Sequence, residues 1–479
     1  MTIAPLAPAP AAVPAAPPAG VPTAVPAAPP AAVLVADRPA AAPARPWTFP
    51  APAAIRLANG LRVGHIARPG HRLAAVGLFL DTPLDAEPEG LDGIAELTSR
   101  ALQEGSAALH GAPFAEEIER CGATFDSIAG PHGIAIALQV PQSRLEAVLE
   151  LLADTLCEPA FPAREIARLR AQRMDEIGHE SAAPHVRGFL GMQSALFGPG
   201  QRAGRAGAGT RESVARIDHT AVRAFFAAHA RPATASAAVA ADLPEAELAR
   251  VLERTLGRWS APAAPLTPVP AVTADDRTRV VLVDRPGAVQ TTLMIGRHGL
   301  DRHAPAWAAQ SIGIQCLGGG LTSRLDQVLR ERRGYTYGVS AIAQPLRSGA
   351  LLSIGGAVAT AVTGPAVAEV FGVLRSLEGG LTRAEQTAAA RNLVGVAPLQ
   401  YQSAASTVKA VVRAAAERLP ADYLGTIHDR LAAVTAEQAT QALLDAFPVD
   451  RLVVVAVGDA AAVRPSLESL DLGPVVLAT

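Results

Sequence analysis

The stretch RVGHIARPG at residues 62–70 recurs as RVVLVDRPG at residues 279–287, 217 residues further along the chain. Each copy is a run typical of a β-strand that ends in an Arg-Pro-Gly turn. Near the end of the chain, LVVVAVGDA (452–460) takes the place of TASAAVAAD (234–242) in the same way. Because a repeat must be recognised before motifs are interpreted, we predict a duplicated unit of about 210 residues.

Apolar periodicity around these stretches predicts the elements of the first unit. We expect an α+β fold with two homologous domains, each a mixed or antiparallel sheet with helices packed mainly on one face. Strands are expected at 55–63 (two pieces around an Asn59-Gly60 turn), 73–80, 133–140 and 233–240, and helices at 92–103, 114–121, 144–156, 163–177, 212–228 and 244–256.

Changes in composition predict the domain boundaries. Residues 1–46 contain 13 prolines, much alanine and three charged residues, so we expect a disordered tail that cannot form a core. Residues 259–275 (WSAPAAPLTPVPAVTAD) have the composition of a linker. The predicted domains are therefore 47–258 and 276–479.

Charge and cysteine content exclude several classes of protein. The formal net charge of -2 gives no overall attraction to nucleic acid or anionic lipid. The start of the chain lacks the basic and unbroken apolar segments of a secretory signal, and no stretch reaches ~20 apolar residues. Cys121, Cys157 and Cys316 are far apart and form no CxxC pair, so we expect buried apolar residues in a reducing compartment. A cytoplasmic location is predicted, with the periplasm or export as the alternative.

Other chemical motifs do not emerge from the sequence. There is no phosphate-binding loop and no G-x-S-x-G nucleophile elbow. His179 and His185 are six residues apart with Pro184 between them, and His298 and His303 are five apart, so neither pair has the spacing of a zinc-binding helix. We interpret these histidines as surface or hydrogen-bonded residues.

Several phrases resemble the pitrilysin and mitochondrial-processing-peptidase family of zinc peptidases. The most specific phrase is LGGGLTSRLDQVLRERRGYTYGVSA at 317–341. Others are LANGLRV at 57–63, GIAELTSRAL at 93–102, FPAREIARLRAQRMDEI at 161–177, AGTRESVARI at 208–217 and DRPGAVQ at 284–290. The resemblance runs from about residue 50 to the end of the chain, in the order found in short two-domain members.

The resemblance implies a metal site that this sequence does not preserve. Catalytic members carry H-x-x-E-H on a helix, with two zinc-binding His, a catalytic Glu, and a further Glu about 75 residues later. The matching positions here are Glu96, Ser99, Arg100 and Glu176. Serine is no general base for a zinc-bound water, and a guanidinium has no lone pair for a metal. We predict no metal and no catalytic residue in this chain, with Glu96 and Glu176 pairing with Arg100 instead.

The second half keeps another family feature, an Arg and a Tyr seven residues apart. The resemblance implies that Arg330 and Tyr337 hydrogen-bond the backbone of a peptide and stabilise charge on its carbonyl. Aligning Gly122 with Gly334 puts Ile118 opposite Arg330 and Phe125 opposite Tyr337. The first half is apolar there, so the fold alone does not require the polar pair.

Other interpretations apply to this segment and its neighbours. A charged stretch at 330–333 could also be a solvated helix end, and Tyr335 is a second candidate tyrosine. We interpret Arg324 as a structural partner for a helix start, with direct substrate contact as the lesser alternative.

The sequence therefore predicts the non-catalytic, substrate-binding subunit of a heterodimeric zinc metallopeptidase that is inactive alone. Its partner would be a homologous chain with an intact H-x-x-E-H, and zinc would be bound in that partner. The alternatives are a structural core or scaffold protein and a homodimeric peptide-binding protein. A scaffold would not need to keep Arg330 and Tyr337. The identity of the peptide substrate does not follow from the sequence.

Overall fold

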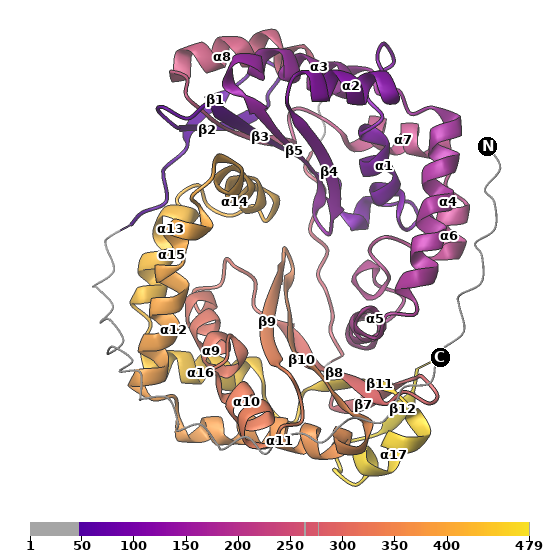
Figure 1. Ribbon diagram of the computed structural model, residues 1–479, viewed down its shortest axis with the longest axis vertical. Helices are drawn as coiled ribbons and strands as arrows, with labels where there is room; N and C mark the ends of the chain where they lie inside the picture. Colours follow the sequence, from indigo (N-terminus) through magenta and orange to yellow (C-terminus); the bar gives the residue numbers. More distant parts are fainter. Residues whose placement is uncertain (1–46, 263–264, 276, 479) are drawn as a thin grey trace, which may run out of the picture. The chain divides into compact units, whose positions relative to one another are not determined.

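Each half of the chain builds a six-stranded mixed sheet in the computed structural model, which describes residues 47–262, 265–275 and 277–478. The strand orders are β1-β2-β6-β3-β5-β4 and β12-β7-β11-β8-β10-β9 (Figure 1). The strands of the first sheet are β1 (Ala53–Arg56), β2 (Arg62–Ala67), β3 (Leu73–Leu80), β4 (Thr124–Gly130), β5 (Gly133–Pro141) and β6 (Ser236–Ala241). Those of the second are β7 (Arg279–Asp284), β8 (Gln290–Gly299), β9 (Val339–Leu346), β10 (Gly349–Ala359), β11 (Val453–Gly458) and β12 (Val475–Leu477).

Five strands of each sheet pair in the same way, and the sheets differ at one edge, where β1 is antiparallel to β2 and β12 is parallel to β7. β2–β6 and β7–β11 are parallel, whereas β3 and β8 run antiparallel to both of their neighbours. After the Arg-Pro-Gly turns, the amide of Gly70 donates to Asp242 Oδ2 at 3.0 Å, and the amide of Gly287 donates to Asp459 Oδ2 at 2.9 Å. The predicted α+β fold and its duplication are confirmed, and the structure adds an equivalent aspartate that closes each turn.

Each half supplies helices to its own sheet, as Figure 1 shows for α1, α2 and α3 beside the first sheet. The helices of the first half are α1 (Ile94–Leu102), α2 (Ala112–Arg120), α3 (Leu145–Cys157), α4 (Ala163–Glu180), α5 (Pro184–Phe197), α6 (Arg211–Ala215), α7 (His219–His229) and α8 (Glu245–Arg254). Those of the second are α9 (Trp307–Gly318), α10 (Arg324–Asp326), α11 (Thr363–Arg375), α12 (Arg383–Gly395), α13 (Ala397–Gln400), α14 (Ala404–Ala416), α15 (Tyr423–Ala432), α16 (Ala436–Ala446) and α17 (Ala460–Glu468). The sequence did not predict α5 or β4.

The halves exchange one helix each. α14 of the second half packs on β3, β5 and β6 of the first sheet, and α5 of the first half packs on β7, β8 and β11 of the second. Val408 and Val412 of α14 lie in one apolar cluster with Ile66 and Phe79. On the other side, α5 contributes Met192, Leu196 and Phe197 to a cluster with valines of β7 and β11. Each sheet therefore has its own helices on one face and a helix of the other half on the opposite face.

The described residues belong to one compact unit that starts at Pro46. No helix among them is both long and apolar enough to cross a membrane. Residues 1–46, for which a disordered tail is predicted, lie outside the described residues. The segment from Ser260 to Thr278 contains no helix or strand where it is described, and the domain boundaries stay predictions.

Candidate functional site

A buried ion pair fixes the start of α1, the helix that carries three of the predicted site residues. Gly93, with a φ of 97°, turns the chain into α1. Glu87 accepts hydrogen bonds from the amides of Gly93 and Ala95, both at 3.1 Å, which satisfies amides that a helix start leaves unpaired. Burial raises the pKa of Glu87, and the ion pair with Arg202 opposes that shift. Nothing local in the sequence pointed to this pair, because its members lie 115 residues apart.

Arg100 of α1 joins the carboxylates of Glu96 and Glu176, which the sequence predicts to be positions of a degenerate metal site. Its Nε donates to Glu96 Oε1 at 2.7 Å, and its Nη1 and Nη2 donate to Glu176 Oε1 and Oε2 at 2.9 and 2.7 Å. Gln172 and Arg173 of α4 also donate to Glu176. The hydrogen bonds that Arg100 donates to Glu176 lower the pKa of Glu176 to about 2. The same bonds, together with the one that Arg100 donates to Glu96, raise the pKa of Arg100. The predicted pairing of both glutamates with Arg100 is present.

This arrangement has the wrong chemistry for a divalent metal. The guanidinium of Arg100 is a fixed cation without a lone pair, and it already binds both oxygens of Glu176. Ser99 is 1% exposed and its hydroxyl is 2.9 Å from that of Ser127 on β4, so it faces a neutral partner. Among the residues that the structure describes, no group of three or more His, Cys, Asp or Glu side chains could hold a metal ion.

The second predicted pair lies on a π-helical turn and the loop that follows it. Arg330 belongs to η5 (Gln327–Arg332), a π-helix that continues α10. Such turns are rare and are frequent at functional sites. Arg330 Nη1 donates to Asp326 Oδ2 at 3.2 Å, and the Asp326 side chain is 3% exposed while that of Arg330 is 35% exposed. Asp326 Oδ1 also accepts the amide of Val339 at 3.4 Å. Buried Asp326 thus anchors one end of a guanidinium that is partly free to bind elsewhere.

The loop after η5 separates its two tyrosines. Gly334, with a φ of 63°, reverses the chain, and the amide of Tyr335 donates to Leu329 O at 2.8 Å. Tyr335 packs half-buried against the core of the second half, whereas Tyr337 is 96% exposed. Of the two candidate tyrosines, Tyr337 is therefore the one that presents its hydroxyl to solvent or a ligand.

The equivalent loop of the first half has the same turn and different side chains. Gly122 has a φ of 65°, close to that of Gly334. Ile118 is buried in the first core, and the ring of Phe125 packs edge-on against Phe114 with centroids 5.6 Å apart. The turn therefore needs the glycine, and it does not need an arginine or an exposed tyrosine.

The guanidinium of Arg324 is bonded within the protein, as a structural role predicts. Its Nε and Nη2 donate to the two oxygens of Glu385 at 2.7 and 3.0 Å, and Nη2 also donates to Gly380 O at 2.7 Å. Hydrogen bonds from Arg324 lower the pKa of Glu385 to about 2. Because Glu385 caps the start of α12, Arg324 joins the start of α10 to that of α12.

The remaining candidates have ordinary surroundings. Cys121 and Cys316 are buried as expected, but Cys157 is exposed at the end of α3, so the expectation of three buried thiols was wrong for that residue. The ring Nε2 of His303 is 3.3 Å from Glu417 O. The ring of His298 packs edge-on against Phe197, with centroids 5.6 Å apart.

Comparisons with known proteins agree with this duplicated fold. Residues 62–197 match the family profile described as insulinase (peptidase family M16), and residues 216–393 match the one described as peptidase M16 inactive domain. An uncharacterized zinc protease of Mycobacterium leprae is 26% identical over 350 residues, which are 71% of this chain and 76% of that protein. The uncharacterized zinc protease YmxG of Bacillus subtilis is 22% identical over 62% of this chain and 71% of its own length.

Solved structures show the same architecture. The crystal structure of a peptidase M16 inactive domain from Pseudomonas fluorescens superposes with a TM-score of 0.78 at 25% identity, covering 85% of this chain and 98% of that one. A chain of complex III2 from Candida albicans has a TM-score of 0.74 at 14% identity, covering 87% and 99%, which shows the fold alone. The two sheets therefore define a duplicated metallopeptidase-like fold.

Two profiles of one family cover most of both halves, and this chain belongs to the peptidase M16 family, the pitrilysin family that its motifs resemble. Residues 216–393 match the inactive domain of that family. Arg100, at the position where the sequence predicts a lost zinc ligand, is bonded to Glu176.

Proposed function

We propose that this chain is the non-catalytic, substrate-binding subunit of a heterodimeric zinc peptidase. The partner is a homologous chain with H-x-x-E-H, and it holds the zinc. Arg330 and Tyr337 bind the backbone of a peptide in the partner's active site. The observation that carries the proposal is the 96% exposure of Tyr337 next to a partly exposed, anchored Arg330, at a turn whose first-half equivalent is packed and apolar.

The two side chains suit binding of a peptide of any sequence. Arg330 keeps donors beyond the one that bonds Asp326, and a guanidinium presents its donors in a fixed geometry. Tyr337 offers one hydroxyl on a rigid ring. Both can donate to a carbonyl oxygen, and these hydrogen bonds strengthen when the carbonyl becomes an oxyanion. Their contribution is positioning and charge stabilisation, while proton transfer and water activation belong to the partner.

The Arg100 network supports the division of labour between two chains. A guanidinium paired with Glu96 and Glu176 takes the place of a metal in the first half. The chain retains the binding pair and has lost the ligands. For the same reason we propose that this chain needs no cofactor of its own. Three cysteines without disulfides support the cytoplasm as its compartment.

Reconstitution with a candidate catalytic chain tests this function. Each chain alone and the copurified pair are assayed with a quenched fluorescent peptide. We expect turnover only from the pair, and zinc only in the partner. Peptide cleavage by this chain alone that stops with a chelator would overturn the proposal, and an inactive complex would favour the scaffold alternative.

Two variants of this chain, each assayed in complex with its partner, test the roles of Arg330 and Tyr337. Arg330→Ala and Tyr337→Phe should each lower kcat by about 10²-fold, the loss typical of one oxyanion donor. Arg332→Ala is the matched control, because Arg332 is exposed on the same π-helix and has no partner among the described residues. Full turnover in both variants would remove the proposed role, provided that complex formation is unchanged.

A further inference from the structure

Asp326 is a buried acid at the end of α10, one helical turn before Arg330. Its side chain is 3% exposed. Oδ2 accepts a hydrogen bond from Arg330 Nη1 at 3.2 Å, and Oδ1 accepts one from the amide of Val339 at 3.4 Å. Transfer of a carboxylate out of water costs free energy that such bonds only partly return. An acid at this position therefore needs a reason beyond packing.

The equivalent position of the first half shows that the fold does not need this acid. When the two turn glycines are aligned, α2 (Ala112–Arg120) is equivalent to residues 324–332, the helix made of α10 and η5. Phe114 then lies opposite Asp326, and it is also buried, at 2% exposure. Its ring packs edge-on against that of Phe125. The same buried position thus accepts an aromatic ring in one half and carries a charge in the other.

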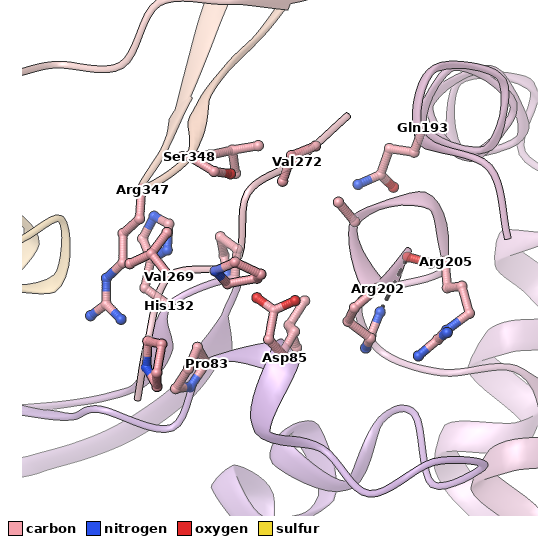
Figure 2. Close-up of a pocket in the computed structure, with 16 residues that line it drawn as sticks. Pro83, Asp85, His132, Gln193, Arg202, Arg205, Val269, Val272, Arg347 and Ser348 are labelled. Atoms are coloured by element: carbon pink, nitrogen blue, oxygen red, sulfur yellow. Dashed lines mark hydrogen bonds between the residues drawn. The ribbon is translucent and has the colours of Figure 1, made fainter. Parts of the chain in front are cut away.

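Two other buried carboxylates pair with arginines that are buried too. Arg202 and Arg347, which Figure 2 shows at the wall of one cavity, have side chains that are each 6% exposed. They bond Glu87 and Asp81, which lie 115 and 266 residues away along the chain. Such pairs join distant segments and serve the fold. The pair at η5 joins residues four apart in one helix, where an ion pair adds little stability, and its guanidinium is 35% exposed.

The bond to Asp326 leaves most of the guanidinium of Arg330 available. The carboxylate holds Nη1, and Nε is 3.8 Å from Oε1 of exposed Glu331, beyond hydrogen-bond distance. The amide of Val339 holds the second oxygen of Asp326, so the carboxylate is itself fixed from two sides. A donor that is fixed before the ligand arrives loses less conformational entropy on binding.

We propose that Asp326 is a positioning residue of the peptide site. It orients the guanidinium of Arg330 toward the peptide carbonyl and touches no substrate itself. Loss of the carboxylate frees the Arg330 side chain to adopt other rotamers, in which its donors no longer meet the carbonyl. This inference rests on the proposed function, because Asp326 acts only through Arg330.

Steady-state kinetics of the complex with the partner chain test this role. Asp326→Asn keeps the shape and loses the charge, so kcat should fall about 10-fold, and Asp326→Leu should lower it about 10²-fold through misplacement of Arg330. KM should change little, because the lost interaction is one made in the transition state. Glu331→Gln is the matched control, since it removes an exposed carboxylate beside the same guanidinium, and it should keep full turnover.

A double-mutant cycle separates positioning from a general structural role. In an Arg330→Ala background, Asp326→Leu should have no further effect on kcat, because the residue through which it acts is gone. A distorted loop would displace Tyr337 as well and lower kcat again.

The outcomes of the cycle distinguish this inference from the proposed function. Additive losses, or wild-type turnover in folded Asp326→Leu while Arg330→Ala is impaired, would overturn the inference and leave the proposed function standing. Full turnover in Arg330→Ala would instead overturn the role of Arg330, and this inference with it. Should Asp326→Leu fail to fold, the same cycle with Asp326→Asn decides between these outcomes.

Discussion

The turn after α2 and the turn after η5 share a backbone and differ in chemistry. Gly122 and Gly334 have φ values of 65° and 63°. The first turn is flanked by buried Ile118 and partly buried Phe125, and the second by Arg330, which is partly exposed and bonded to Asp326, and by exposed Tyr337. The fold therefore requires the glycine and accepts either apolar or polar residues at the flanking positions.

A second contrast lies within the first half, between the ligands that a family zinc site requires and the residues that this chain has at the predicted positions. Two histidines and a glutamate on neighbouring helices make a zinc site. At the positions predicted for these ligands this chain has Glu96, Arg100 and Glu176, and the helices α1 and α4 contact each other. An ion network therefore links the two helices in this chain.

The largest effect is expected on zinc binding, when histidines are introduced at the predicted ligand positions. In Glu96→His with Arg100→His, two imidazoles one helical turn apart would join Glu176 on one face, which is the ligand set of a catalytic zinc site. We expect about one zinc per chain by metal analysis after exhaustive dialysis. Glu96→His with Arg100→Ala is the control, because two ligands should not retain the metal. A folded, metal-free double-histidine variant would show that the backbone has diverged from the metal-binding geometry.

The next largest effect is expected on stability, when the positive charge of Arg100 is removed. Arg100→Met leaves Glu96 and Glu176 close together without a counter-charge, and we expect a loss of about 2–3 kcal/mol in the free energy of unfolding, below the value for a fully buried pair because Arg100 is partly exposed. Urea unfolding measures the loss. An unchanged midpoint would mean that the network contributes only specificity.

The same variant should change the dependence of stability on pH. The pKa of Glu176 is lowered in the folded chain from its ordinary value of 4.5 to about 2, so its stabilising contribution is present above about pH 4.5 and is lost as the pH falls toward 2. The difference in unfolding temperature between the wild type and Arg100→Met should therefore shrink over that window. A difference that stays constant down to pH 2 would contradict the assignment to Glu176.

A glycine under the exchanged helix tests the packing of the halves. A Cβ on Gly77 of β3 would lie 2.6 Å from Val412 Cγ2 and 2.7 Å from Val408 Cγ1 of α14. We expect Gly77→Ala to cost about 2 kcal/mol through overpacking, measured by thermal or urea unfolding. Val412→Ala in the same chain should recover part of the loss. Equal losses in the presence and absence of Val412→Ala would argue against close packing of α14 on this sheet.

The smallest effect is expected from the paired turns. A Cβ on Gly334 would meet nothing within 4 Å, and one on Gly122 would meet only Pro141, at 3.4 Å. Gly334→Ala and Gly122→Ala should therefore each cost about 1 kcal/mol, from the left-handed backbone alone. Similar unfolding midpoints for the two variants would support the equivalence of the turns, and a large difference would break it.

Local patterns predicted much of the fold and part of the site. Alternating strands and Arg-Pro-Gly turns marked the duplication, and β3 was predicted with its observed bounds, 73–80. Helix spacing placed Glu96 and Arg100 on one face, where they bond. The motif resemblance brought Glu176 into the same site from 76 residues away. The strand β4 was missed because the residue types of TFDSIAG do not follow its burial: the buried position is the polar Ser127, and Ile128 is 68% exposed.

The sequence by itself determined which residues repeat, which turns need glycine and that Glu96 and Arg100 share a helix face, because these depend on residue type and short spacing. Only the tertiary structure decided the exchange of α5 and α14, the buried pair of Glu87 and Arg202, and the exposure of Tyr337 beside packed Tyr335. Those outcomes depend on contacts between segments more than 100 residues apart, or on which face of a loop meets the core. Burial there is a property of the assembled chain, so no local pattern of apolar and polar residues carries it.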